Sequence, residues 1–154
     1  GGAGNDTITG TLGGDTISGG TGSDIINGRG GKDIMSGGDG ADRFMFNTTE
    51  SSVTAGLGDQ ITDWSSEDAI SFNLLGAATA TTYVETAASD YASALGIASN
   101  AIAGGTIDFV LVQIGGDLVL FADSNNDNGS ADTGVVIIGK TLADIDFTNV
   151  IAGS

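Results

Sequence analysis

The chain has 154 residues, of which 20 are acidic and 4 basic, and its formal charge is −16. This balance suits a protein that gathers hard cations such as calcium, and it argues against nucleic acid or an anionic membrane, which both require clustered Lys and Arg. The absence of Cys and His excludes disulfides, thiolate zinc sites and the usual general base, and no apolar stretch is long enough to span a bilayer.

Five tandem nonapeptides open the chain over residues 1–45. With a period of nine they are GGAGNDTIT, GTLGGDTIS, GGTGSDIIN, GRGGKDIMS and GGDGADRFM. Gly stands at positions one and four, Asp at position six and a large apolar residue at position eight of every repeat. A flexible linker has no reason to hold four positions in phase. We expect six residues of each repeat to form a turn and three to form a short strand, giving an all-β fold that begins with a parallel β-roll.

The sixth-position aspartates are candidate calcium ligands. Two repeats make one coil, so turns one, three and five stack on one side (side one) and turns two and four on the other (side two). Strands lie about 4.8 Å apart, so an ion midway between stacked turns lies roughly 2.4 Å from each, a distance that fits calcium better than magnesium. If each carboxylate bridges both neighbouring layers, the complete sites pair Asp6 with Asp24, Asp24 with Asp42, and Asp15 with Asp33. The pattern thus predicts at least three calcium ions.

The period breaks at residues 46–57, where we expect a surface excursion, and then partly resumes. Asp59 and Asp68 lie nine residues apart, and each is followed two residues later by Ile. We predict that residues 58–72 pack as one further coil that closes the roll, with the two isoleucines extending its core. The two aspartates would complete the last calcium site on each side. The alternative for this pair is a solvated acidic hairpin.

A helix is predicted over residues 86–103, because apolar residues recur on one face and Ser89 stands where an N-cap is needed. The apolar residues of that face are Tyr91, Ala94, Leu95, Ala98 and Ile102.

Strands are predicted for most of the remaining chain. Residues 107–114 and 118–122 form a hairpin across a Gly-Gly-Asp turn, residues 135–138 form another strand, and residues 141–151 form a helical turn that leads into a last strand. Residues 46–154 are therefore expected to form a mainly β cap with one helix.

The loop 123–132 contains a second group of possible calcium ligands. Asp123, Asn125 and Asp127 form a D-x-N-x-D pattern that resembles the start of an EF-hand loop, and Asp132 follows. The Gly of the loop is one place late, and no Glu stands at position twelve. An Asn/Gly-rich hairpin loop without metal is the alternative, and the sequence leaves both open.

The repeats resemble those of the RTX (repeats-in-toxin) family, because GGAGND, GGTGSD and GGDGAD match its GGxGxDxUx nonapeptide. The resemblance implies that carbonyl groups of turn positions one to four join the Asp as ligands. This adds the carbonyls of Gly2, Gly4, Gly13, Gly19, Gly20, Thr21, Gly22, Gly28, Gly30, Gly31, Gly38 and Gly40. The sequence departs from the family pattern at position two, where Thr11 and Arg29 replace Gly; their carbonyls remain, but we expect strain in those turns.

The rest of the chain resembles the half-domain that follows RTX repeats in serralysin-type proteases and surface-layer proteins. The matching stretches are GADRFMF (40–46), GDQITDW…EDAISF (58–72) and FADSNNDNGSADTGVVIIG (121–139). The resemblance implies secretion or a bacterial cell-surface location, with export through a type I ABC-transporter channel guided by the C-terminus. We read no N-terminal export signal, and we expect the chain to be a fragment of a longer protein.

Two functions remain after this reading. The first is a calcium-binding module that stays unfolded where calcium is scarce, folds outside the cell and supports export of its parent protein. The alternative is a structural surface-layer or adhesin segment that uses calcium for lattice assembly, surface attachment or self-association. We expect no catalysis, because without His or Cys only Ser–Lys or paired carboxylates remain, and Lys140 has no motif around it.

Overall fold

A computed structural model describes residues 1–47, 50–73, 75–125, 127 and 129–153. The described chain is mainly β, with one α-helix and one short 3₁₀ helix. The strands of the N-terminal half are β1 (Gly2–Ala3), β2 (Thr7–Thr9), β3 (Thr16–Thr21), β4 (Ile25–Asn27), β5 (Ile34–Asp39), β6 (Arg43–Phe46), β7 (Asp59–Ile61) and β8 (Ala69–Phe72). The C-terminal half contains β9 (Tyr83–Ala88), α1 (Tyr91–Ile102), β10 (Phe109–Ile114), β11 (Asp117–Ala122), β12 (Thr133–Ile137), the 3₁₀ helix η1 (Phe147–Asn149) and β13 (Val150–Ala152).

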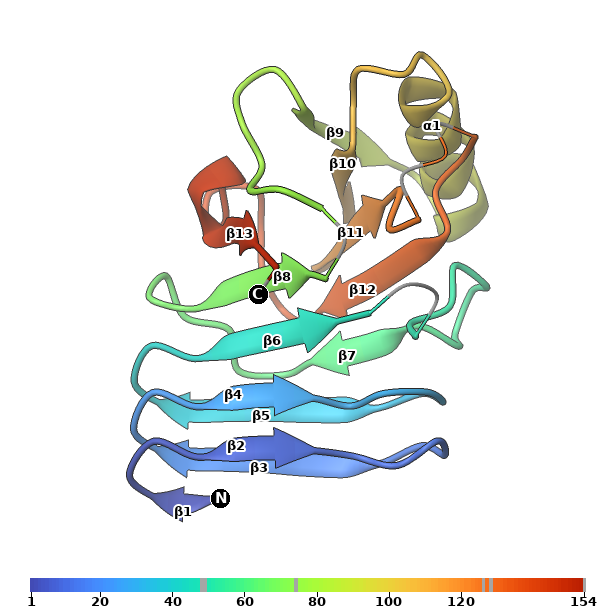
Figure 1. The fold of residues 1–154 in the computed structure, drawn as a ribbon. Coiled ribbons are helices and arrows are strands. Elements are labelled where there is room, and N and C mark those ends of the chain that lie inside the picture. Colours follow the sequence, from blue (N-terminus) through green and yellow to red (C-terminus); the bar gives the residue numbers. More distant parts are fainter. Residues whose placement is uncertain (48–49, 74, 126, 128, 154) are drawn as a thin grey trace.

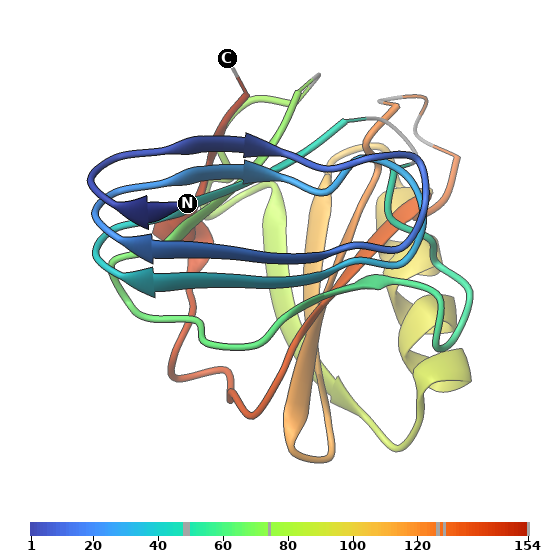
Figure 2. The ribbon, with the colours of Figure 1, turned by 90° about the horizontal axis from the view of Figure 1, so that it is seen from below.

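The first eight strands wind into a parallel β-roll. Strands β1, β3, β5 and β7 are neighbours in one sheet, and β2, β4, β6 and β8 are neighbours in the other (Figure 1). Seen along the stack, the chain runs out through one sheet, turns, and returns through the other, so one coil consumes two nonapeptides (Figure 2). Ile8 pairs with Ile26, and Ile26 pairs with Phe44. This register of eighteen residues confirms the predicted roll.

The core of the roll consists of the eighth-position side chains of both sheets. Met35 and Ile61 pair across β5 and β7, while Phe44 and Ile70 pair across β6 and β8, and all four side chains are completely buried. Strand alternation sends the intervening residues outward. Each buried side chain of this size contributes about 1.5–3 kcal/mol through removal of apolar surface from water. Residues 59–72 therefore continue both stacks, and their two isoleucines lie on the predicted core line.

Strands from the far end of the sequence cover the last coil. Strand β12 pairs in parallel with β7, and β13 pairs in parallel with β8. Residues 58–72 thus extend the roll but do not close it, which corrects the predicted closure. A lone added coil would leave two strand edges unpaired, and exposed edges invite association with other chains. Trp64 is buried, its ring stacks on Phe44 with a centroid separation of 6.3 Å, and its Nε1–H donates to the Asp144 carbonyl of the C-terminal half at 3.3 Å.

The C-terminal half extends one roll sheet through β12, β11, β10 and β9. Strands β10 and β11 form the predicted hairpin, with Ile114 opposite Asp117, so the turn consists of two glycines rather than three residues. Gly115 takes a φ of +60°, a left-handed conformation that suits glycine in a two-residue turn. Helix α1 packs on β10 and β9 (Figure 1). Its face toward the sheet buries Ala94, Ala98 and Ile102.

The helix begins later than predicted, and its N-cap is Asp90 rather than Ser89. Asp90 has an extended backbone, and its Oδ1 accepts a hydrogen bond of 2.8 Å from the Ser93 backbone N–H. Residues 86–88, predicted as helix, belong to β9, which pairs in parallel with β10. In the part of the chain that the structure describes, no helix is long and apolar enough to cross a membrane.

Candidate calcium-binding site

The sixth-position aspartates form two hydrogen-bonded ladders, one along each side of the roll. In every step, Oδ1 of an aspartate accepts the backbone N–H of the aspartate one coil earlier. On side one, Asp24 accepts from Asp6 at 2.7 Å, Asp42 from Asp24 at 2.8 Å, and Asp68 from Asp42 at 3.0 Å. On side two, Asp33 accepts from Asp15 and Asp59 from Asp33, both at 2.8 Å. Asp59 and Asp68 thus stand at the sixth position of the added coil.

The second carboxylate oxygen is unsatisfied in most of these residues. Oδ2 is buried and has no hydrogen-bond partner among the described residues in Asp6, Asp24, Asp33, Asp42 and Asp59. The carboxylates of Asp24, Asp33, Asp42 and Asp59 are at most 1% exposed. A buried carboxylate oxygen without a partner is costly unless a cation compensates it. The prediction gave both oxygens of each Asp to calcium. In the structure Oδ1 of these four residues already accepts one backbone amide, which leaves it a second lone pair, whereas Oδ2 has no partner among the described residues.

Backbone carbonyls reach the same places as these oxygens. A Cβ built on Gly19, the first residue of turn three, would collide with Asp24 Oδ2 and with the carbonyl oxygen of Gly37 from the next layer. On side two, a Cβ on Gly10 would lie 2.5 Å from the Gly28 carbonyl oxygen and 2.8 Å from Asp15 Oδ2. Only glycine leaves room for a carboxylate oxygen and a carbonyl oxygen of successive layers to converge.

This donor set fits calcium. Calcium takes six to eight oxygen ligands and accepts carboxylates and carbonyls together. No three or more acidic side chains in the described residues come together in a way that could hold a metal. A calcium site in the described roll would therefore combine aspartates with backbone carbonyls, as the family resemblance implies. Ligation by each of these residues stays a prediction.

Asp15 is the exception in the regular repeats. Its Oδ2 accepts hydrogen bonds from the backbone N–H and the hydroxyl of Thr11. The neighbouring turn four keeps the unpartnered oxygen on Asp33, although Arg29 replaces glycine there. Arg29 has a φ of +68° and is the only non-glycine residue with positive φ in the described chain. The expected strain at position two is thus present at Arg29 and is avoided at Thr11.

The ends of the two ladders differ. On side one, Asp68 Oδ2 accepts the Ser65 backbone N–H at 2.7 Å, so both of its oxygens have partners. On side two, Asp59 keeps an unpartnered Oδ2, and its own backbone N–H donates to the Ser51 hydroxyl at 2.7 Å. Of the two predicted capping acids, Asp59 therefore resembles a repeat aspartate more closely than Asp68 does.

Asp63 is a site residue that the sequence reasoning missed. Its carboxylate accepts the Gly37 N–H at 3.0 Å, the Gly38 N–H at 2.9 Å and the Ser36 hydroxyl at 2.7 Å. It thus binds the start of turn five from the layer above. The signal was available: Asp63 lies 26 residues after Gly37, the same interval that separates Asp42 from Asp68.

Glu50 adds a further acid near side two. Its carboxylate accepts hydrogen bonds from the Asn47 backbone at 2.8 Å and from the Asn27 amide at 3.3 Å. Burial, together with the nearby charges of Asp33 and Glu50, raises the pKa of Asp59 to about 7. Burial also raises the pKa of Asp33 above its usual range. Without a cation, Asp59 and Asp33 therefore stay protonated to a higher pH than ordinary carboxyl groups do.

On side one, burial likewise raises the pKa of Asp42 and of Asp68 above the usual range of a carboxyl group.

The loop 123–132 connects the antiparallel strands β11 and β12. Asp132 accepts the Ser124 N–H through Oδ1 at 2.7 Å and the Asn125 N–H through Oδ2 at 3.1 Å. Asp123 Oδ1 accepts the Asp127 N–H at 3.2 Å. These acids cap the loop's own amides, which favours the hairpin-loop alternative. Calcium binding by Asp123, Asn125, Asp127 and Asp132 stays a prediction.

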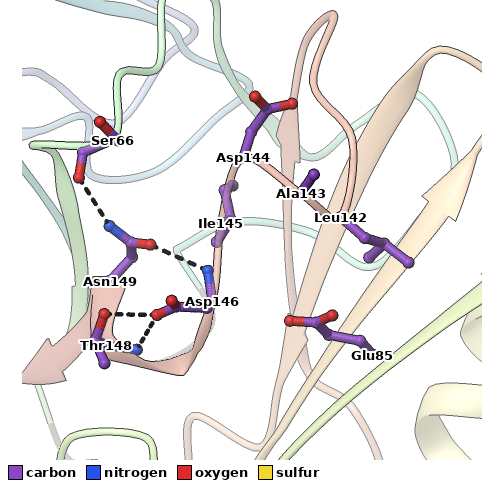
Figure 3. Close-up of a pocket in the computed structure, with 9 residues that line it drawn as sticks. All are labelled: Ser66, Glu85, Leu142, Ala143, Asp144, Ile145, Asp146, Thr148 and Asn149. Atoms are coloured by element: carbon purple, nitrogen blue, oxygen red, sulfur yellow. Dashed lines mark hydrogen bonds between the residues drawn. The ribbon is translucent and has the colours of Figure 1, made fainter.

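A pocket of about 440 Å³ lies between the last coil and the C-terminal segment, and Glu85, Asp144 and Asp146 are among its lining residues (Figure 3). Asp146 accepts the Thr148 N–H at 2.7 Å, and the hydrogen bonds from Thr148 lower its pKa. Asn149 joins the walls by donating to the Ser66 carbonyl at 3.4 Å. These bonds hold the segment before β13 against the turn of the last coil, because the Asn149 amide also donates to the Asp68 carbonyl at 3.0 Å.

Comparison with known proteins identifies the repeats. Residues 1–12 and 9–44 match the profile of the RTX calcium-binding nonapeptide repeat. Comparison with curated proteins gives no significant match.

Solved structures share the fold. The AlgE6R3 subunit of the Azotobacter vinelandii mannuronan C5-epimerase is 26% identical, with a TM-score of 0.52, over 98% of this chain and 80% of that one. The extracellular lipase LipA from Serratia marcescens is 17% identical, with a TM-score of 0.50, over 94% of this chain and 20% of the lipase. Residues 1–44 therefore carry the calcium-binding nonapeptide repeats of secreted RTX proteins, and they wind into a parallel β-roll.

Proposed function

We propose that the chain is a calcium-gated folding module in which calcium binds between stacked turns and converts a self-repelling chain into the β-roll. The observation that carries this proposal is the row of buried Oδ2 atoms that lack a partner among the described residues. Such a row destabilises a roll that holds no cation, because each buried charge lacks compensation. Calcium would supply that compensation, so its binding free energy becomes folding free energy.

The proposed ions lie between successive layers on each side. On side one, Asp6, Asp24 and Asp42 provide Oδ2, with the carbonyls of the glycine-rich turns completing the ligand sets. On side two, the pair Asp15 and Asp33 provides the third site. Asp59 is proposed as a further ligand at the capped end because its Oδ2 matches those of the repeats.

The proposal includes export of the parent protein through a type I channel. An acidic chain with a charge of −16 and 27 glycines repels itself and has a large ordering entropy, which favours the unfolded state where calcium is scarce. An unfolded chain can pass through a channel, and folding in calcium outside would oppose its return. The match to RTX repeats and the fold shared with an extracellular lipase support this setting.

We assign no catalytic role to the chain. Five of the seven ladder aspartates are buried and hydrogen-bonded to a neighbouring layer, and His and Cys are absent from the sequence. A survey of hydrolytic activity that found turnover abolished by a roll substitution would contradict this assignment.

Calcium titration of the isolated chain tests the folding proposal. Far-ultraviolet circular dichroism should change from mostly disordered in chelator to β-rich in calcium, with a midpoint between about 10⁻⁵ and 10⁻³ M, near the range of extracellular calcium modules. Magnesium at the same concentration should have far less effect, because it requires shorter bonds and a stricter geometry. A roll that is fully folded in excess chelator would refute calcium-gated folding.

A further inference from the structure

Turn two differs from the other four turns at its aspartate. Asp15 Oδ2 accepts the Thr11 backbone N–H at 2.6 Å and the Thr11 hydroxyl at 2.9 Å. In the other four turns the same oxygen is buried and has no hydrogen-bond partner in the described structure. The atom that would face calcium is therefore already occupied in turn two.

The cause lies at the second position of the turn. In turns one, three and five this position is glycine with a positive φ, for example +117° at Gly20. Arg29 in turn four also has a positive φ, of +68°, which a side chain without a β-branch tolerates at some cost. Thr11 is β-branched, and a positive φ would be a severe outlier for it, so it stays outside that region.

The rest of turn two follows this change. Gly13, at the fourth position, does not have a positive φ, whereas Gly31 at the same position of turn four has a φ of +111°. Turn two thus takes a different backbone path, and along this path the Thr11 amide reaches Asp15.

Charge acts in the same direction. Turn four carries Arg29 and Lys32, which are two of the four basic residues in the sequence. Turns one, three and five contain no base, and turn five adds Asp39. The space between turns two and four is therefore less favourable to a divalent cation than the spaces on side one.

We propose that Thr11 withdraws Asp15 from calcium, so that the site between turns two and four is the weakest in the repeats and fills after the two sites on side one. This inference rests on the proposed function, because it concerns the order of filling of the same roll. Asp15 Oδ2 must release two hydrogen bonds before it can ligate an ion. Bonds of this kind to a charged group correspond to a loss of affinity of about tenfold or more.

Substitutions at Thr11 test the proposal in the whole chain. Equilibrium dialysis at graded free calcium gives the number of ions bound and their dissociation constants. Thr11→Gly should tighten the weakest site by about tenfold or more, because glycine allows the positive φ and frees the carboxylate. Thr11→Asn, which also tolerates the left-handed region, should do so in part. The control Thr11→Val removes the hydroxyl bond but keeps the β-branch and the backbone N–H bond to Asp15, so it should tighten the site much less than Thr11→Gly does.

Asp15→Asn then locates the effect. In the unmodified chain this substitution should leave the tightly bound ions unchanged, and in the Thr11→Gly background it should abolish the tightened site. Circular dichroism in saturating calcium checks that each variant folds. Loss of a tightly bound ion from Asp15→Asn alone would overturn the inference and leave the proposed function intact. Absence of calcium binding by every variant would overturn the proposed function, and this inference with it.

Discussion

Asp24→Asn should separate the two roles of a repeat aspartate. Asp24 Oδ1 accepts the Asp6 N–H from the layer below, and its Oδ2 lies where the Gly37 carbonyl of the layer above converges. An asparagine amide keeps the first bond and places a donor near that carbonyl, while it removes a buried charge. In chelator we therefore expect Asp24→Asn to raise the free energy of unfolding of any residual folded state by about 1–3 kcal/mol.

In calcium the same substitution should be strongly destabilising, because Asp24 reaches both neighbouring layers, its Oδ2 toward turn five and its Oδ1 toward turn one, and so lies between the two proposed ions of side one. At a free calcium concentration of 100 times the dissociation constant, each ion contributes about 2.7 kcal/mol to the free energy of unfolding. Loss of two ions would therefore cost about 5 kcal/mol, and Asp6→Asn, which faces one ion in this chain, about half as much. Urea unfolding in chelator and in calcium measures the gain in stability without the ion and the loss of stability with it. Equal losses from Asp6→Asn and Asp24→Asn would refute the two-sided stacking of ions.

Three further predictions concern single residues. The pKa of Asp59 is raised to about 7 from its usual 3.8, so the calcium-free fold binds more protons than the unfolded chain between these values and loses stability as pH rises through that window. Calcium competes with these protons, so its affinity should fall as pH falls below about 7, and Asp59→Asn should reduce this dependence in titrations from pH 5 to 8. Arg29→Gly should stabilise the roll by about 1 kcal/mol in chemical denaturation by relieving a left-handed φ, and Arg29→Lys, which keeps the strain, should not. Asp90→Ala should cost about 1 kcal/mol through loss of the N-cap, whereas a cost from Ser89→Ala as large as that would contradict the cap assignment.

The roll could be predicted because its information is periodic. A phase of nine residues fixes which side chains point inward, and the register of Ile8, Ile26 and Phe44 follows from it directly. The hairpin of β10 and β11 was equally local, since two apolar runs and a glycine pair define it. For these two features, composition and spacing were sufficient.

Features that depend on distant partners could not be read from the sequence. Residues 86–88 have a helical pattern in isolation, but β10 recruits them as part of β9. The cover over the last coil comes from β12 and β13, and no local signal announces that pairing. Thr11 and Arg29 behave differently because only Thr11 is branched at Cβ. A consensus pattern does not distinguish them, since both simply replace Gly at position two of the repeat.

The pairing of β12 with β7 and of β13 with β8 gives the roll a direction. Each coil of a stacked repeat contacts only its neighbours, so its stability depends on a neighbour that is already in place. At the capped end, β12 and β13 provide the edges on which β7 and β8 pair, and the cap has an apolar core of its own. At the other end, β1 and β2 are the outermost strands of their sheets. The roll should therefore fold one layer at a time, starting with the coil next to the cap and ending with β1 and β2. Amide hydrogens should exchange slowest in β7 and β8 and progressively faster toward β1, so that a gradient of protection runs along the stack.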